Sequence, residues 1–80
     1  MSHAPIHVVP AHGRWAVSIE GESQFRSEHR IQLVASMYAR ELAKARQADL
    51  VIHARDGTIR QVSTFGPRGA PRWVPGEGSE

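Results

Sequence analysis

The segment from Asp49 to Phe65 constrains the fold more than any other, because it predicts a β-hairpin. It begins with the β-preferring run Leu50-Val51-Ile52 and contains Asp56-Gly57, a dipeptide favoured in two-residue type I′ turns. We predict strands over 49–55 and 58–65, paired across that turn. One face then collects Leu50, Ile52, Ala54 and Ile59 and should meet a helix, whereas Val51, His53, Arg55, Thr58, Arg60 and Val62 lie on the other, with His53 opposite Arg60.

The N-terminal segment predicts a second hairpin. Residues 6–10 form a short β-branched run, and residues 11–13 form a turn that ends in Gly13. Trp15, Val17 and Ile19 then alternate with polar or small residues, as in a strand with one buried face.

One amphipathic helix is predicted between the hairpins, over roughly residues 28–47. Ser27 is a suitable N-cap, and Glu28 suits the positive end of the helix dipole. Leu33 and Met37 lie off the apolar stripe, where a second chain could contact them. The stripe itself recurs at helical spacing and contains Ile31, Val34, Ala35, Tyr38, Leu42 and Ala45.

These elements predict an α+β fold of order β-β-α-β-β. We expect a four-stranded antiparallel sheet in which the first strand lies between the second and the third, with the helix on one face. A single helix cannot cover both faces of such a sheet. The uncovered face is therefore expected to be polar, to hold the C-terminal tail, or to be buried in a dimer.

Eighty residues allow one small domain. Residues 67–80 are rich in Gly and Pro and are interpreted as a flexible tail, residues 1–5 as a frayed terminus, and residues 6–66 as the domain. The absence of cysteine excludes disulfides and thiol chemistry. No apolar run approaches the roughly 20 residues of a membrane helix, and no secretory signal is evident, so we expect a cytoplasmic protein that does not enter a membrane.

The sequence offers no catalytic or metal-binding pattern. The five histidines lack the spacing of a zinc site, and no carboxylate pair, nucleophile motif or phosphate-binding glycine loop is present. A core of this size also leaves little room for a small-molecule pocket. We therefore expect no enzyme activity, no cofactor, no metal and no small-molecule substrate, with structural or exposed roles for the histidines.

Basic residues suggest one binding hypothesis. The net charge is only +2, yet arginines concentrate in the middle of the chain. A basic strand and helix face could bind nucleic acid through its phosphates. The candidate contacts are Arg40, Lys44, His53, Arg55 and Arg60.

A protein partner is the other hypothesis. Leu33 and Met37 offer an apolar helix patch, and Trp73 lies in a Pro-flanked segment that resembles a short binding motif. These three residues are the candidate protein contacts.

Several strings together resemble a family of small bacterial proteins of unknown function. They are His7-Val8-Val9-Pro10, Trp15-Ala16-Val17, the alanine-rich stretch 39–45, and the hairpin string 50–59, with Phe65-Gly66 matching an aromatic-Gly ending. The resemblance covers about residues 6–66. It departs at Ala54, where the family commonly has Gly, and in the longer tail. It implies a small, cytoplasmic α+β domain and brings no established activity, catalytic residue or cofactor.

We therefore predict a non-enzymatic interaction domain that self-associates as a homodimer or binds another protein. The alternative is a nucleic-acid-associated module that uses the basic face.

Overall fold

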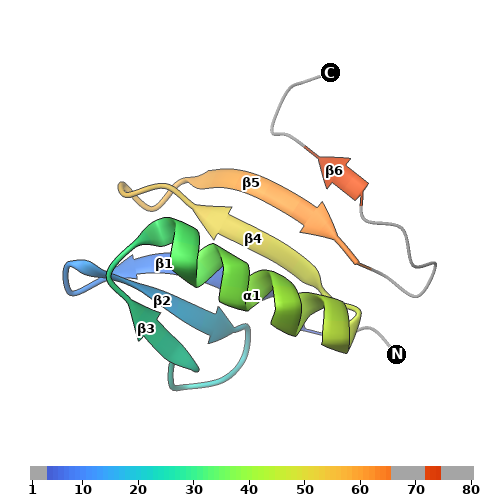
Figure 1. Cartoon of the computed structure of the whole chain (residues 1–80), viewed down its shortest axis with the longest axis horizontal. Helices are drawn as coiled ribbons and strands as arrows, with labels where there is room; N and C mark the ends of the chain where they lie inside the picture. The colour runs from blue at the N-terminus through green and yellow to red at the C-terminus, as the bar shows by residue number, and fades with distance from the viewer. Residues whose placement is uncertain (1–3, 66–71, 75–80) are drawn as a thin grey trace.

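The computed structural model describes residues 4–65 and the backbone of residues 72–74. Within these residues, a single helix packs on one face of a mixed six-stranded sheet (Figure 1). The order across the sheet is β3-β2-β1-β4-β5-β6. Five of these strands lie within residues 6–64, and β6 extends the edge. The elements are β1 (Ile6–Ala11), β2 (Arg14–Ile19), β3 (Ser27–His29), α1 (Gln32–Arg46), β4 (Asp49–His53), β5 (Ile59–Thr64) and β6 (Arg72–Val74).

The first predicted hairpin is confirmed. β1 and β2 pair antiparallel from Ile6 opposite Ile19 to Ala11 opposite Arg14. The two turn residues both have positive φ, 53° at His12 and 75° at Gly13, which is the backbone of a type I′ turn. Along both strands the side chains alternate between the two faces of the sheet. Val8 and every second residue before and after it therefore point toward α1.

The predicted helix start is wrong, because residues 27–29 form a strand instead of a helical turn. β3 pairs antiparallel with the outer edge of β2, with Trp15 opposite His29. Ser27, the predicted N-cap, places its hydroxyl 2.9 Å from Nε2 of His29 and caps no helix. The helix instead begins at Gln32 after Ile31, which makes no side-chain cap hydrogen bond. Pairing with β2 satisfies the backbone of this segment, so helix formation starts later.

This extra strand also changes the direction of the rest of the sheet. The predicted neighbours β2-β1-β4-β5 are correct, but β1 and β4 pair in parallel, with Ile6 opposite Leu50 and Val8 opposite Ile52. β3 adds one reversal of the chain before α1, so β4 enters the sheet along the direction of β1. The prediction of an all-antiparallel, four-stranded sheet is therefore wrong, whereas the α+β class with one helix is confirmed.

The helix packs on the sheet through alanines. Ala35, Ala39 and Ala43 are completely buried. Ile31, Val34 and Tyr38, which the predicted stripe placed inside, are exposed, so their predicted burial is wrong. Small side chains let α1 lie close to β1, β2 and β4, which carry the largest fully buried side chains of the core. These are Ile6, Val8, Val17, Ile19 and Leu50.

The second predicted hairpin is present with a different turn. Gly57 has φ of 93°, whereas Asp56 is not among the residues with positive φ. The Gly57 N–H donates to the Ala54 carbonyl (2.8 Å) and the Ala54 N–H to the Thr58 carbonyl (2.7 Å). This pattern is a type I turn followed by a left-handed glycine, which makes a three-residue loop in place of the predicted type I′ turn.

Candidate functional site

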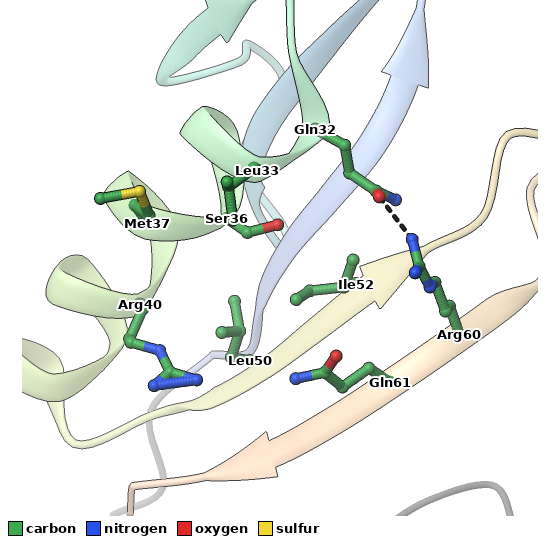
Figure 2. Close-up of a pocket in the computed structure, with 9 residues that line it drawn as sticks. All are labelled: Gln32, Leu33, Ser36, Met37, Arg40, Leu50, Ile52, Arg60 and Gln61. Carbon is green, nitrogen blue, oxygen red and sulfur yellow. Dashed lines mark hydrogen bonds between the residues drawn. The ribbon is translucent and has the colours of Figure 1, made fainter.

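A groove runs between α1 and the neighbouring strands β4 and β5. The backbone of α1 lies close to β1, β2, β3 and β4 but not to β5, so the helix does not cover the part of this sheet face that β5 forms. Figure 2 shows helix side chains on one wall and strand side chains on the other. The hollow has a volume of about 580 Å³ and is lined by Gln32, Leu33, Ser36, Met37, Arg40, Leu50, Ile52, Arg60 and Gln61, which we call the arginine groove.

Arg60 enters this groove because of a bulge in β5. The predicted register holds for Val51 opposite Val62, but Ile59 rather than Arg60 stands opposite His53. The irregularity lies at Ile52 and His53, where β5 carries one residue more than β4. Arg60 therefore leaves the face on which it was predicted to accompany His53, and it lies on the helix side. Ile59, predicted to meet the helix, is instead exposed.

Gln32 fixes the end of the groove. Its Nε2 donates to the backbone carbonyl of His53 (3.0 Å), and its Oε1 accepts from Nη1 of Arg60 (2.5 Å), as the dashed line in Figure 2 marks. The first residue of α1 is thus tied to the end of β4 and the start of β5. These bonds hold the helix wall and the strand wall at a set separation.

A second hollow adjoins this end of the groove and has a volume of about 510 Å³. It shares Gln32 and Arg60 with the groove. The Arg55 guanidinium carbon lies 5.6 Å from the centre of the Trp15 ring, which is within cation–π range. The other lining residues are Trp15, Arg30, Ile31, Ala54 and Arg55.

Both hollows carry positive charge and no described acidic residue. Arg40 and Arg60 line the groove, and Arg30, Arg55 and Arg60 line the second hollow. Neither set of lining residues contains Asp or Glu. The acidic groups with a lowered pKa lie elsewhere. The pKa of Glu22 is lowered chiefly by hydrogen bonding to Arg26, and the pKa of Asp56 is lowered chiefly by the Thr58 hydroxyl.

The residues proposed to contact nucleic acid lie in separate parts of the structure. Arg40 and Arg60 line the groove, Arg55 lies against Trp15, and Lys44 pairs with Glu41 (3.5 Å) outside both hollows. His53 lies on the opposite face of the sheet, as the alternation along β4 requires. These five residues therefore do not form one continuous basic face.

Two of the three residues proposed to contact protein are brought together. Leu33 and Met37 stand on the helix wall of the groove, with 66% and 59% of their surfaces exposed. The backbone of Trp73 in β6 pairs with that of Ser63 in β5, but the Trp73 side chain lies outside what the structure describes.

A histidine pair on the opposite face was not predicted from the sequence. Nδ1 of His7 lies 3.0 Å from Nε2 of His53. The other ring nitrogens also have partners, Glu20 Oε1 at 2.8 Å from His7 Nε2 and the Gly57 carbonyl at 3.0 Å from His53 Nδ1. The residues are 46 apart in the chain, and only the parallel register of β1 with β4 places them side by side.

Two further observations limit the kinds of site that the described residues can form. The described residues contain no group of three or more His, Asp or Glu side chains placed to hold a metal ion. None of the described helices is long and apolar enough to cross a membrane.

Comparison with known proteins identifies a family without assigning an activity. A family model described as an uncharacterized protein conserved in bacteria (DUF2188) matches residues 6–65. Neither the curated proteins nor the solved structures contain a match. The matched region spans β1 through β5 and includes the arginine groove and the histidine pair. The chain therefore belongs to DUF2188, an uncharacterised family conserved in bacteria.

Proposed function

We propose that the domain is a binding module that holds an acidic segment of another protein in the arginine groove. The observation that carries this proposal is the combination of an apolar floor with guanidinium groups and no carboxylate among the lining residues. Leu50 and Ile52 form the floor, and Arg40 and Arg60 lie near it. Such a surface fits an apolar side chain flanked by carboxylates.

The arginines favour carboxylates on physical grounds. A guanidinium donates two parallel hydrogen bonds to one carboxylate, which is stronger and more directional than a neutral hydrogen bond. Gln32 already holds Arg60, so less side-chain entropy is lost when a ligand binds there.

Leu33 and Met37 supply the apolar component of the contact. Both are more than half exposed, and both border the groove. Burying them against a partner would remove apolar surface from water, and the flexible methionine can adjust to different side chains. From Leu33 to Arg40 the helix rises about 10 Å, which matches roughly three residues of an extended peptide.

Binding rather than catalysis is supported by the chemistry of the lining residues. Apart from the Ser36 hydroxyl, the groove offers amides, guanidinium groups and apolar side chains. Acid–base catalysis needs a group that exchanges protons near neutral pH, and arginine and glutamine do not. We therefore propose that the protein is not an enzyme at this site.

The test is fluorescence anisotropy with a labelled peptide that carries one leucine between pairs of glutamates. We expect saturable binding that weakens at higher salt, and at least a tenfold loss in Arg40→Gln, Arg60→Gln and Met37→Asp. Lys44→Gln is the matched control, because it removes a charge from the same helix outside the groove. Equal binding by the groove variants and the parent protein would refute the proposal.

Two further outcomes would redirect the assignment. A labelled oligothymidine that binds more tightly than the acidic peptide, with dependence on Arg40 and Arg60, would favour the nucleic-acid alternative. Light scattering at about 0.1 M and about 1 M salt tests self-association. A salt-resistant dimer that Leu33→Asp separates into monomers would show that the groove binds a second copy of the chain.

A further inference from the structure

The His7–His53 pair lies apart from the arginine groove, on the opposite face of the sheet. In β1, Ile6 and Val8 are buried toward α1, so His7 between them projects to the other side. In β4, His53 lies two residues beyond Val51, the parallel partner of His7. The two rings meet diagonally across neighbouring strands, with their centres 5.2 Å apart.

The outer nitrogens of the pair determine which nitrogens carry hydrogen. The Gly57 carbonyl can only accept, so Nδ1 of His53 donates to it. The Glu20 carboxylate likewise accepts from Nε2 of His7. When both rings are neutral, each ring has one N–H, and that N–H is donated to Glu20 by His7 and to the Gly57 carbonyl by His53. Nδ1 of His7 and Nε2 of His53 then both bear lone pairs, and these face one another across 3.0 Å.

Two lone pairs that face one another at this distance repel, and either a shared proton or a bound metal ion removes that repulsion. We propose that this pair is a binding site for a late first-row transition metal ion such as Zn²⁺, Ni²⁺ or Cu²⁺, bound by Nδ1 of His7 and Nε2 of His53. Neutral imidazole is the preferred ligand of these ions. Glu20 adds a negative charge close to the site and favours a cation there.

The distances suit a shared ion. With metal–nitrogen bonds of about 2.0–2.1 Å, two imidazole nitrogens stand about 2.8–3.0 Å apart at a right angle and about 3.3–3.4 Å apart at the tetrahedral angle. The observed 3.0 Å matches the first arrangement and lies within about 0.4 Å of the second. The ring centres lie 5.2 Å apart, so the rings stand nearly end to end, and both must tilt to direct their lone pairs at one ion.

The groups behind the two rings are those that support metal-bound histidines. Such histidines usually donate their remaining N–H to a carboxylate or a backbone carbonyl, which fixes the ring and its tautomer. Glu20 and the Gly57 carbonyl do this here, one for each ring. The protein supplies two ligands, so water or a ligand from a partner completes the coordination of the ion.

The first experiment is titration calorimetry of the full chain with Ni²⁺ and Zn²⁺, in a His3→Gln background that removes an unrelated histidine. We expect one ion per chain, no binding of Mg²⁺, and at least a tenfold loss of affinity in His7→Gln and in His53→Gln. Glu20→Ala should weaken binding by about tenfold, because it removes the group that orients His7. His12→Asn is the matched control, since His12 is an exposed histidine in a turn and Asn tolerates its positive φ.

Histidine nitrogen NMR provides a second readout that does not depend on the variants folding. Without metal, we expect hydrogen on Nε2 of His7 and on Nδ1 of His53. On addition of Zn²⁺, the signals of the two facing nitrogens should shift while those of His29 do not.

Three results would overturn the proposal. The first is an affinity unchanged in both His7→Gln and His53→Gln. The second is no binding at about 1 mM metal, which is weaker than a two-imidazole site should be. The third is a His7 ring that carries hydrogen on both nitrogens and loses neither when metal is added, because the pair then holds a shared proton in place of an ion.

Discussion

Replacing Ala39 with leucine tests how α1 lies on the sheet. Ala39 is completely buried at the middle of the alanine face, between Ala35 and Ala43. Leucine adds three carbon atoms at a point where the helix backbone approaches the strands closely. Overfilling a packed core costs about 1–3 kcal/mol. A domain of this size has a free energy of unfolding of about 4–12 kcal/mol, so the loss is a large fraction of it.

The matched variant is Ala45→Leu. The sequence pattern placed Ala45 on the buried stripe, but the structure leaves it exposed. Leucine is a good helix former, so this change should alter the free energy of unfolding by no more than about 0.5 kcal/mol.

Thermal unfolding followed by circular dichroism measures both variants. With about 4–8 °C for each kcal/mol, Ala39→Leu should lower Tm by roughly 5–20 °C, and Ala45→Leu should leave it nearly unchanged. The opposite order, with Ala45→Leu the more destabilising, would show that α1 is rotated about its axis so that Ala39 does not meet the sheet. Equal effects would refute the argument that the alanine face sets the helix–sheet distance.

Three further predictions concern the ends of the elements. Gln32→Ala removes the donor to the His53 carbonyl and the acceptor for Arg60, so urea unfolding should show a loss of about 1 kcal/mol; an unchanged midpoint would mean that these bonds contribute nothing. Gln47 ends α1 in the left-handed region at φ 53°, so Gln47→Gly should raise the free energy of unfolding by about 0.5–1 kcal/mol, and a lower Tm would contradict this. The Asp56 pKa is lowered by Thr58, so the carboxylate stabilises the fold above about pH 4, and this contribution is lost as the pH falls through the lower pKa of the folded state. Asp56→Asn should therefore be less stable than the parent at pH 7 and equal to it near pH 2, and a difference that persists in acid would argue against a role for the charge.

The sequence predicts the hairpins and their neighbours because their signals are local. Alternation from Trp15 to Ile19 and the β-branched run before it give both strands of the first hairpin. The Asp56-Gly57 pair gives the position of the second turn. It does not give the turn type, because aspartate and glycine also occur together in the three-residue loop that the structure adopts.

The helix face was not predictable from hydrophobicity alone. Helical spacing placed Ile31, Val34 and Tyr38 on the buried stripe, yet the side that packs on the sheet is the one with the alanines, whose small side chains let the backbones approach. The displaced large side chains remain on the surface. Leu33 and Met37 were correctly placed off the buried stripe, whereas the groove that they border was not predicted.

The short strand β3 is the main reason why the two candidate sites could not be predicted from the sequence. Ser27–His29 carries no strong strand signal, and it forms a strand by pairing with the edge of β2. Its presence reverses the chain once more, and the pairing of β4 with β1 changes from antiparallel to parallel. In the parallel register His53 lies beside His7, and the bulge in β5 then sends Arg60 to the opposite face. The histidine pair and the arginine groove are therefore products of pairing between strands that are distant in the chain, and no spacing within one segment encodes either of them.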